Sequence, residues 1–327
     1  MNFPHSPGFG YLIAFLAMIV GTLSTIPFTD AARKWGPVAI NHFRLLVGFI
    51  VLSLLVMILE KLSPIALFSI PSATEYAYLC TSGIIGLVIG DYFGFHCLAI
   101  LGAKRFSIFN TISPGAALAF GFLLVGESID IIGILGMAIS IGGMIWFIQA
   151  SDTKEIDAHL VHEYGKKSKG VLFGVLSALF QGFHMALAKK ALTEESIPIS
   201  PIHATWIRVL GAMIAYFIFT FATGKFKSNV LNPIRAERST ILKATLASIF
   251  GLVLSIVLVM WSLSLCKVAV AQTIISLSPI LILPVAYLLY KEKITWKTFF
   301  AGLVSIFGVY VLIWRDDIAT IFGLHLH

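Results

Sequence analysis

The sequence predicts an all-α integral membrane protein with ten transmembrane helices in two inverted five-helix repeats. Three observations support this fold class: the composition, ten long apolar segments, and an internal duplication. Hydrophobic residues make up 58% of the chain and charged residues 12%, and the mean hydropathy is +0.94. A water-soluble domain carries about 25% charged residues. Apolar helices that satisfy their own backbone hydrogen bonds are the structures expected in lipid.

The duplication relates residues 86–143 to residues 251–308 without a gap, at a constant offset of 165 positions. A repeat of this length indicates that the whole fold is built from two copies of one unit. The matched pairs include Gly86 and Gly251, Pro114 and Pro279, Glu127 and Glu292, and Gly143 and Gly308.

Ten segments reach the length of about 20 apolar residues that a helical crossing needs. They are residues 10–27, 37–59, 76–100, 104–126, 129–149, 170–190, 202–223, 241–265, 268–290 and 295–314. The longest join, residues 150–169, is a polar linker. It separates a first five-helix repeat (10–149) from a second (170–314), and a short tail (315–327) follows.

Five spans per repeat is an odd number, so the two repeats are expected to cross the membrane in opposite directions. In transporters with this plan, the substrate site lies near the midplane between the repeats. Most of the 23 basic residues fall in joins on the side of the first join. This excess predicts that the first join is cytoplasmic and that both termini are outside.

The net charge of +7 does not predict nucleic-acid binding, because Lys and Arg beside the spans serve to orient a membrane protein. The chain shows no nucleophile–base pattern, no phosphate-binding P-loop and no metal-ligand spacing. We therefore expect no enzymatic activity, no cofactor and no metal.

The candidate site begins with Asp91, an acid inside an apolar span and therefore costly to bury. Arg44 in the neighbouring antiparallel span lies at a similar depth, roughly 12–14 Å below the first-join surface at 1.5 Å per residue. Asn41, His42, His96 and Asn110 are expected in the same third of the membrane. One interpretation is that Asp91 binds and releases a proton during transport. The other is a purely structural Asp91–Arg44 pair, or an Arg44 that extends toward the interface.

The second repeat differs at the matched positions. Asp91 corresponds to Ile256 and His96 to Trp261, so Arg208, the counterpart of Arg44, has no acidic partner from the eighth span. Gln181 and His184 lie at a depth from which they could reach Arg208. These differences predict a cavity that is polar on one side and aromatic on the other, suited to an amphipathic organic solute. The alternative for His184 is a packing or hydrogen-bonding role.

Pro114 and Pro279 occupy matched positions within spans, where proline frees a backbone carbonyl and loosens a helix. They are hinge candidates for alternating access, although tolerated kinks are common in membrane helices. Glu127 and Glu292 begin the turns into the following spans. There an acid stabilises a helix N-terminus, and a structural role is expected.

These residues resemble the drug/metabolite transporter superfamily in its ten-span form with two EamA-type domains. The resemblance rests on a proline in the fourth span, a Gly-Glu turn and a Gly-rich fifth span, here Pro114, Gly126-Glu127 and residues 133–143. The second repeat has Pro279, Glu292 and residues 302–308, with Lys291 in place of the glycine. An arginine early in the second span, Arg44 or Arg208, is also typical. Members usually have the N-terminus inside, whereas the charge count favours outside.

The resemblance implies secondary transport of a small organic metabolite such as an amino acid, a drug, a sugar or a nucleotide derivative. We expect export across the cytoplasmic membrane by alternating access, with proton coupling through Asp91 or as an uncoupled facilitator. The alternatives are a membrane-embedded enzyme that acts on lipid-like substrates and a non-transporting scaffold or receptor. Ten spans can enclose a cavity in one chain, so a monomer is expected and a homodimer is the alternative.

Overall fold

The computed structural model describes residues 6–150, 167–194, 199–235, 237–281 and 295–321, and the regular elements in these ranges are all helical. Glu292 and most of the predicted polar linker lie outside them. Within the described ranges, nine helices are long and apolar enough to cross a membrane, and Val268–Leu281 is a shorter apolar segment. The predicted all-helical, multi-pass membrane architecture agrees with this. The ninth predicted span, 268–290, is described only as far as Leu281.

The first half of the chain contains α1 (Pro7–Trp35), α2 (Pro37–Leu59), α3 (Ala66–Ser69), α4 (Ala73–Gly83), the π-helix η1 (Ile84–Gly90), α5 (Asp91–Asn110), α6 (Ser113–Val125) and α7 (Ile131–Ala150). Local sequence sets several of these boundaries. Gly36 separates α1 from α2 with a φ of +85°, which glycine adopts without strain. Ser72 and Glu75 form a reciprocal capping box that begins α4. Gly126 ends α6 in the left-handed conformation.

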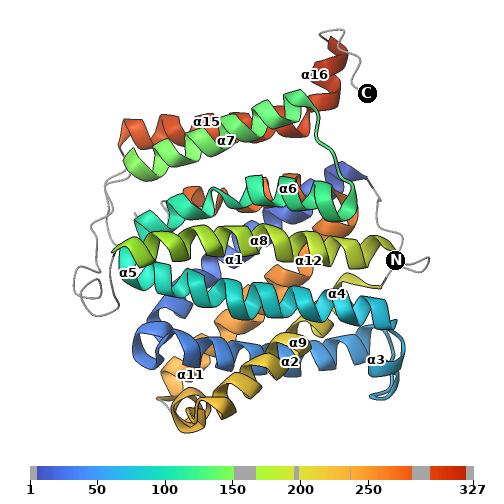
Figure 1. Ribbon diagram of the computed structural model, residues 1–327, viewed down its shortest axis with the longest axis vertical. Helices are drawn as coiled ribbons and strands as arrows, with labels where there is room; N and C mark the ends of the chain where they lie inside the picture. The colour runs from blue at the N-terminus through green and yellow to red at the C-terminus, as the bar shows by residue number, and fades with distance from the viewer. Residues whose placement is uncertain (1–5, 151–166, 195–198, 236, 282–294, 322–327) are drawn as a thin grey trace.

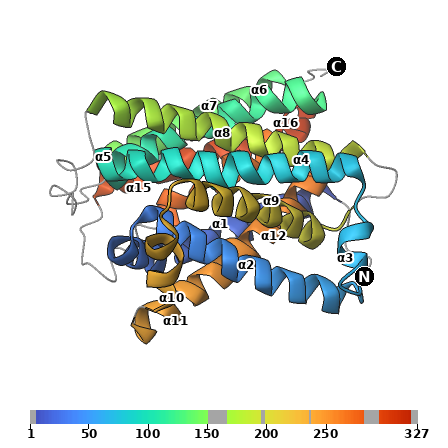
Figure 2. The same cartoon turned by 60° about the horizontal axis from the view of Figure 1, so that its bottom comes forward.

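The second half contains α8 (Lys167–Glu194), α9 (Pro201–Ala222), η2 (Lys227–Leu231), α10 (Asn232–Ile234), α11 (Arg238–Ala247), η3 (Ser248–Leu254), α12 (Ser255–Leu265), α13 (Val268–Ile275), α15 (Trp296–Ile313) and α16 (Arg315–Ile321). Helices α5, α7, α8 and α15 lie across the molecule in Figure 1, whereas α1, α9 and α12 run obliquely to them, and the described chain begins and ends on the same side. In both ribbon views α5 lies beside α8, the first long helix of the second half (Figures 1 and 2).

The two halves pack together reciprocally. α1 packs on α12 and α13, while α8 packs on α5 and α6. A side chain at Gly10 would meet Leu265 and Cys266, and a side chain at Gly170 would meet Ile100 and Leu101. Gly10 and Gly170 open the two repeats in the matched segments GYL and GVL, and Ile100 and Leu101 correspond to Leu265 and Cys266 at the offset of 165. A hydrogen bond is repeated in the same way: Ser177 Oγ donates to Gly90 O at 3.1 Å and Ser255 Oγ donates to Ala17 O at 3.0 Å.

The last helices of the two halves, α7 and α15, form a closely packed pair along one edge of the molecule (Figure 1). Gly136 and Gly143 on α7 and Gly308 on α15 allow the two backbones to approach. Ser305 Oγ donates to Ser140 O at 3.1 Å, and these two serines are matched residues of the repeat. The pair therefore packs about matched positions of its two helices.

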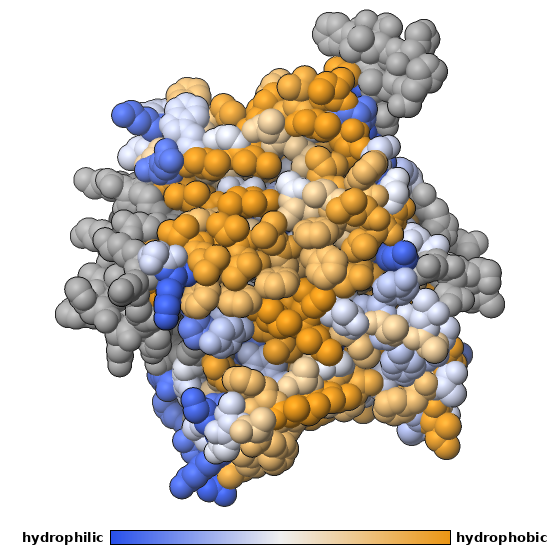
Figure 3. Space-filling view, in the orientation of Figure 1, coloured by the Kyte–Doolittle hydropathy of each residue, from blue (hydrophilic) through white to orange (hydrophobic). Residues whose placement is uncertain are grey.

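The surface carries a broad apolar band across the middle of the molecule, between polar edges on the left and right (Figure 3). Most long helices expose large apolar side chains, among them Phe15, Leu54, Phe122, Ile218 and Phe307. An apolar surface of this extent fits contact with lipid chains rather than water.

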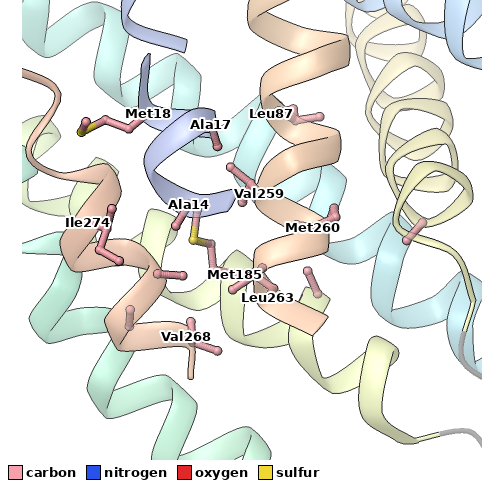
Figure 4. Close-up of a cluster of buried hydrophobic side chains, with 14 of the residues drawn as sticks. Ala14, Ala17, Met18, Leu87, Met185, Val259, Met260, Leu263, Val268 and Ile274 are labelled. Atoms are coloured by element: carbon pink, nitrogen blue, oxygen red, sulfur yellow. The ribbon is translucent and has the colours of Figure 1, made fainter. Parts of the chain in front are cut away.

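The main buried apolar cluster lies where the two halves meet (Figure 4). It joins residues of α1 and η1 from the first half to residues of α8, α12 and α13 from the second. The labelled members are Ala14, Ala17, Met18, Leu87, Met185, Val259, Met260, Leu263, Val268 and Ile274. The junction between the halves is thus a packed core.

A polar contact joins the two halves at the end of α2. Glu60 accepts hydrogen bonds from Ser200 and from His203 Nδ1, the latter at 3.3 Å. His203 Nε2 lies 3.0 Å from Leu67 O, so each ring nitrogen of this buried histidine faces an oxygen acceptor. The contact ties α2 and α3 to the start of α9.

Acid is expected to weaken this contact. Burial raises the pKa of Glu60, but hydrogen bonds from His203 and Ser200 outweigh burial and place the pKa below its ordinary value of 4.5. A carboxyl with a lowered folded-state pKa stabilises the fold above about pH 4.5 and loses that contribution as the pH falls through the folded-state pKa. We expect Glu60→Gln to lower stability at pH 7 by about 1 kcal/mol, as for other partly exposed ion pairs.

Thermal unfolding in nanodiscs between pH 7 and pH 3.5 measures this effect. The wild-type protein should lose more stability over that interval than Glu60→Gln. Glu237→Gln is the matched control, because the Lys34–Glu237 pair is solvent-exposed on both sides (57% and 69%) and contributes little to stability, so this variant should stay close to the wild type. Identical pH profiles for the wild type and Glu60→Gln would contradict the prediction.

Candidate functional site

The candidate site is built around η1, the π-helical turn that directly precedes Asp91. In this turn Asp91 N–H donates to Gly86 O, five residues back, and the carbonyl of Leu87 is left without that donor. Asn41 Nδ2 on α2 donates to Leu87 O at 2.9 Å. The wide turn therefore draws the first turns of α2 against the third span. Such π-helical turns occur often at functional sites.

Arg44 and Asp91 form an ion pair between α2 and the start of α5. Asn41 Oδ1 accepts from Arg44 Nε at 2.5 Å, and Asn41 Nδ2 also donates to the hydroxyl of Tyr216 on α9 at 2.7 Å. The Arg44 guanidinium lies 5.9 Å from the centre of the Phe28 ring, within cation–π range. The side chains of Arg44 and Asp91 are 14% and 19% exposed, so the charges are largely removed from water.

Arg208 on α9 forms the second part of the site. Its Nη2 lies 2.9 Å from His184 Nδ1 and its Nη1 lies 3.3 Å from Met260 Sδ. Arginine only donates hydrogen bonds, so Nδ1 must accept, and the proton of a neutral His184 sits on Nε2. His184 Nε2–H then donates to Gln181 Oε1 at 2.8 Å.

The two parts of the site face η1 from opposite halves of the chain. At Gly86 a Cβ atom would lie 2.6 Å from the His184 ring, and at Gly83 it would meet the backbone of Arg208. The structure thus brings together Arg44, Asp91, Arg208, His184 and Gln181 of the predicted residues.

Three other predicted residues lie apart from this cluster in their described contacts. His96 Nδ1 contacts Tyr92 O of its own helix at 2.7 Å, and its ring packs in a tilted arrangement on Tyr92 and edge-to-face against Phe173. Asn110 is the last residue of α5, and its carbonyl accepts from Ser113 Oγ at 2.6 Å. Trp261 packs edge-to-face against Phe9 at the start of α1.

The two hinge candidates follow matched breaks in the helices. α6 begins at Ser113 after a break at Thr111 and Ile112, and Pro114 is its second residue. In the second half α13 ends at Ile275, residues 276 and 277 form the same break, and the helix resumes at residue 278, just before Pro279. The Ser113 hydroxyl donates a hydrogen bond to the Asn110 carbonyl. In a continuous helix that carbonyl would accept from the N–H of residue 114, which proline lacks.

Glu127 lies at the start of a helix in the other half of the chain. Its Oε2 accepts from Val268 N, the first residue of α13, at 2.7 Å, and its Oε1 lies 3.7 Å from Lys189 Nζ. Lys189 also donates to Leu263 O at 2.5 Å, near the end of α12. The sequence predicted that Glu127 stabilises the N-terminus of the next span along the chain, α7. In the structure it instead contacts the N-terminus of α13. Burial raises the pKa of Glu127, opposed by the Val268 N–H and Lys189.

Sequence analysis missed two features of the site. The first feature is the pair of π-helical turns η1 and η3, which lie in matched regions of the third span of each half. Scattered glycines are the only sequence signal for these turns. Tyr216 joins α9 to Asn41. His42, which the sequence placed at the depth of Arg44 and Asp91, is buried and packs against Tyr216 and Phe217 beside a small cavity that Asn229 also lines. Among the described residues, no group of three or more His, Cys, Asp or Glu side chains is placed to hold a metal.

Comparisons with known proteins give a family and a fold. The EamA-like transporter family matches residues 8–149 and again residues 168–314. A solved crystal structure aligns with a TM-score of 0.70 at 14% sequence identity, covering 93% of this chain and 96% of the other; at that identity it shows the fold alone. No curated protein sequence gives a significant match. Two matches that together span most of the chain identify it as a member of the EamA-like transporter family, with two EamA domains, within the drug/metabolite transporter superfamily.

Proposed function

We propose that this protein is a secondary transporter that exports a small organic solute across the cytoplasmic membrane by alternating access. Its ten spans would form two inverted five-helix repeats, residues 10–149 and 170–314. The reciprocal contacts of α1 with α12 and of α8 with α5 support this arrangement, because two related units that face each other make matched contacts. Both membership of a transporter family and the small-molecule substrate that it implies agree with the proposal.

The observation that carries the proposal is the charged cluster at the junction of the halves. Arg44 and Asp91 come from the first half and Arg208 from the second, and all three lie in apolar helices long enough to cross the membrane. Charged side chains in such helices are costly and usually belong to a substrate or ion pathway. A junction between two repeats is also where alternating access exposes a site to each side in turn.

In the proposed cycle, Asp91 is the proton-binding group. Its ion pair with Arg44 holds α2 against the third span, together with the Asn41 bridge to Leu87 O. A proton on Asp91 would remove the negative charge, weaken the pair and release α2 for movement. The matched breaks before Pro114 and Pro279 supply two points at which the fourth spans could bend. A facilitator without a coupling ion is the competing mechanism.

Flux through proteoliposomes tests the proposed function. Purified protein is reconstituted and exposed to a pooled metabolite library, with and without an imposed pH gradient, and protein-free liposomes serve as the control. We expect one solute class to cross only where protein is present, and faster when the gradient is applied. Flux that ignores the gradient would favour the facilitator. Folded protein that moves no solute would overturn the transport proposal.

A further inference from the structure

Arg208 is a buried cation that forms no ion pair with any described carboxylate. Arg208 is 1% exposed. No described carboxylate oxygen lies within 4.0 Å of its guanidinium nitrogens, the distance that defines an ion pair. Its Nε has no hydrogen-bond partner among the described groups. Its two contacts are with neutral acceptors, His184 Nδ1 and Met260 Sδ. Arginine is almost never fully buried unless it is paired.

The two arginines of the site share one acid. Asp91 is bound to Arg44, so the described cluster of Arg44, Asp91 and Arg208 carries a net positive charge inside the membrane. Transferring an unpaired ion from water into such a site is strongly unfavourable. The matched position to Asp91 in the second half is Ile256, so the repeat supplies no acid at the corresponding place.

The groups around Arg208 are arranged to donate. His184 accepts from Arg208 and passes its own proton to Gln181 Oε1, which leaves the Gln181 amide N–H groups and Arg208 Nε–H as donors. Met260, the other side-chain contact of Arg208, belongs to the apolar core at the junction of the halves (Figure 4). A planar guanidinium in apolar surroundings binds a carboxylate or phosphate through two parallel hydrogen bonds.

We propose that the solute carries an anionic group, a carboxylate or a phosphate, and that Arg208 binds it. This inference rests on the proposed transport function and adds the substrate class. The anion supplies the negative charge that the second half lacks, and Gln181 and His184 hold the guanidinium in position to receive it. Arg44 remains the partner of Asp91.

Matched probes test the inference. Thermal unfolding of the whole protein in nanodiscs is measured with succinate and succinamide, benzoate and benzamide, and glycerol 3-phosphate and glycerol. We expect an anionic probe to raise the Tm and its uncharged counterpart to have no effect. The carboxylate and phosphate pairs decide which anion is preferred. Equal stabilisation by a probe and its uncharged counterpart would overturn the inference.

Variants separate a binding role from a structural role. Arg208→Gln should weaken binding of the anionic probe by about 30-fold or more, while the ligand-free Tm stays the same or rises because an unpaired charge is removed. Arg315→Gln is the matched control: Arg315 is also buried but is paired with Asp130 at 3.0 Å. That variant should lower the Tm and leave anion binding unchanged. If Arg208→Gln fails to fold, Arg208→Lys should show a weaker anion affinity.

The solutes that cross in the flux experiment distinguish the two proposals. Transport of uncharged or cationic solutes alone would leave the transport function in place and overturn the anion inference. If the Arg208→Gln variant transports anions with the wild-type affinity, the anion inference is likewise overturned and the transport function stands. If nothing is transported and no probe binds, both proposals fail.

Discussion

Asp91→Asn is expected to abolish gradient-driven accumulation of the solute. One proton per solute and a gradient of about two pH units support roughly 100-fold accumulation, because each pH unit is worth about 1.4 kcal/mol. Asparagine cannot bind and release the proton, so the variant should equilibrate its solute to a ratio of about one. The wild-type protein should accumulate solute well above that ratio in the same proteoliposomes.

Two control variants separate the loss of the Asp91 carboxylate from a general effect of the substitution on folding. Asp317→Asn makes the same chemical change at an exposed residue of α16 and should accumulate solute as the wild type does. Asp91→Glu keeps a titratable group beside Arg44 and should retain part of the coupling. Unchanged accumulation in a folded Asp91→Asn variant would eliminate Asp91 as the coupling group and leave the pair with Arg44 as a structural contact.

Gly136→Leu is expected to cause the largest loss of stability. A Cβ atom at this position would lie 2.7 Å from Leu312 N and 2.8 Å from Gly308 O. These are backbone atoms of α15, which cannot yield without separating α7 from α15. Overpacking typically costs about 1–3 kcal/mol, and a clash with backbone should reach or exceed the upper end of that range. Thermal unfolding and the yield of monodisperse protein measure the effect.

Gly142→Leu on the same helix is the matched control. Nothing lies within 4 Å of a Cβ atom at Gly142, and the residue is on the exposed side of α7. Leucine there should be neutral or slightly stabilising, because it restricts the unfolded chain and favours the helix. Equal losses in the two variants would show that the α7–α15 contact is not the reason for the glycines.

Depth along a helix can be predicted from sequence, but direction around the helix axis is harder. A rise of 1.5 Å per residue places Arg44 and Asp91 at one level, and the structure joins them. His96 was expected nearby at a similar depth. It follows Asp91 by five residues, which turns it by about 140° to another side of a helix with 3.6 residues per turn. Its contacts with Tyr92 and Phe173 reflect that direction.

The role of Glu127 depended on a helix that is remote in sequence. Its position beside Gly126 predicts an acid at a helix N-terminus, and the nearest such helix along the chain is α7. The observed donor is Val268, 141 residues away in the other half. Only packing between the halves brings that N–H close, and nothing local to Glu127 encodes it.

The sequence was sufficient to predict an all-helical, multi-pass membrane protein with two EamA domains, because lipid demands long apolar segments and a repeat preserves its spacing. It also identified Arg44, Asp91 and Arg208 as charges within spans. The tertiary structure was needed for the rest. It shows that η1 leaves the Leu87 carbonyl to Asn41, that Tyr216 completes this bridge, and that Arg208 is buried against neutral acceptors. Such contacts join residues from different helices, and their geometry depends on the rotation and approach of helices that a linear pattern does not record.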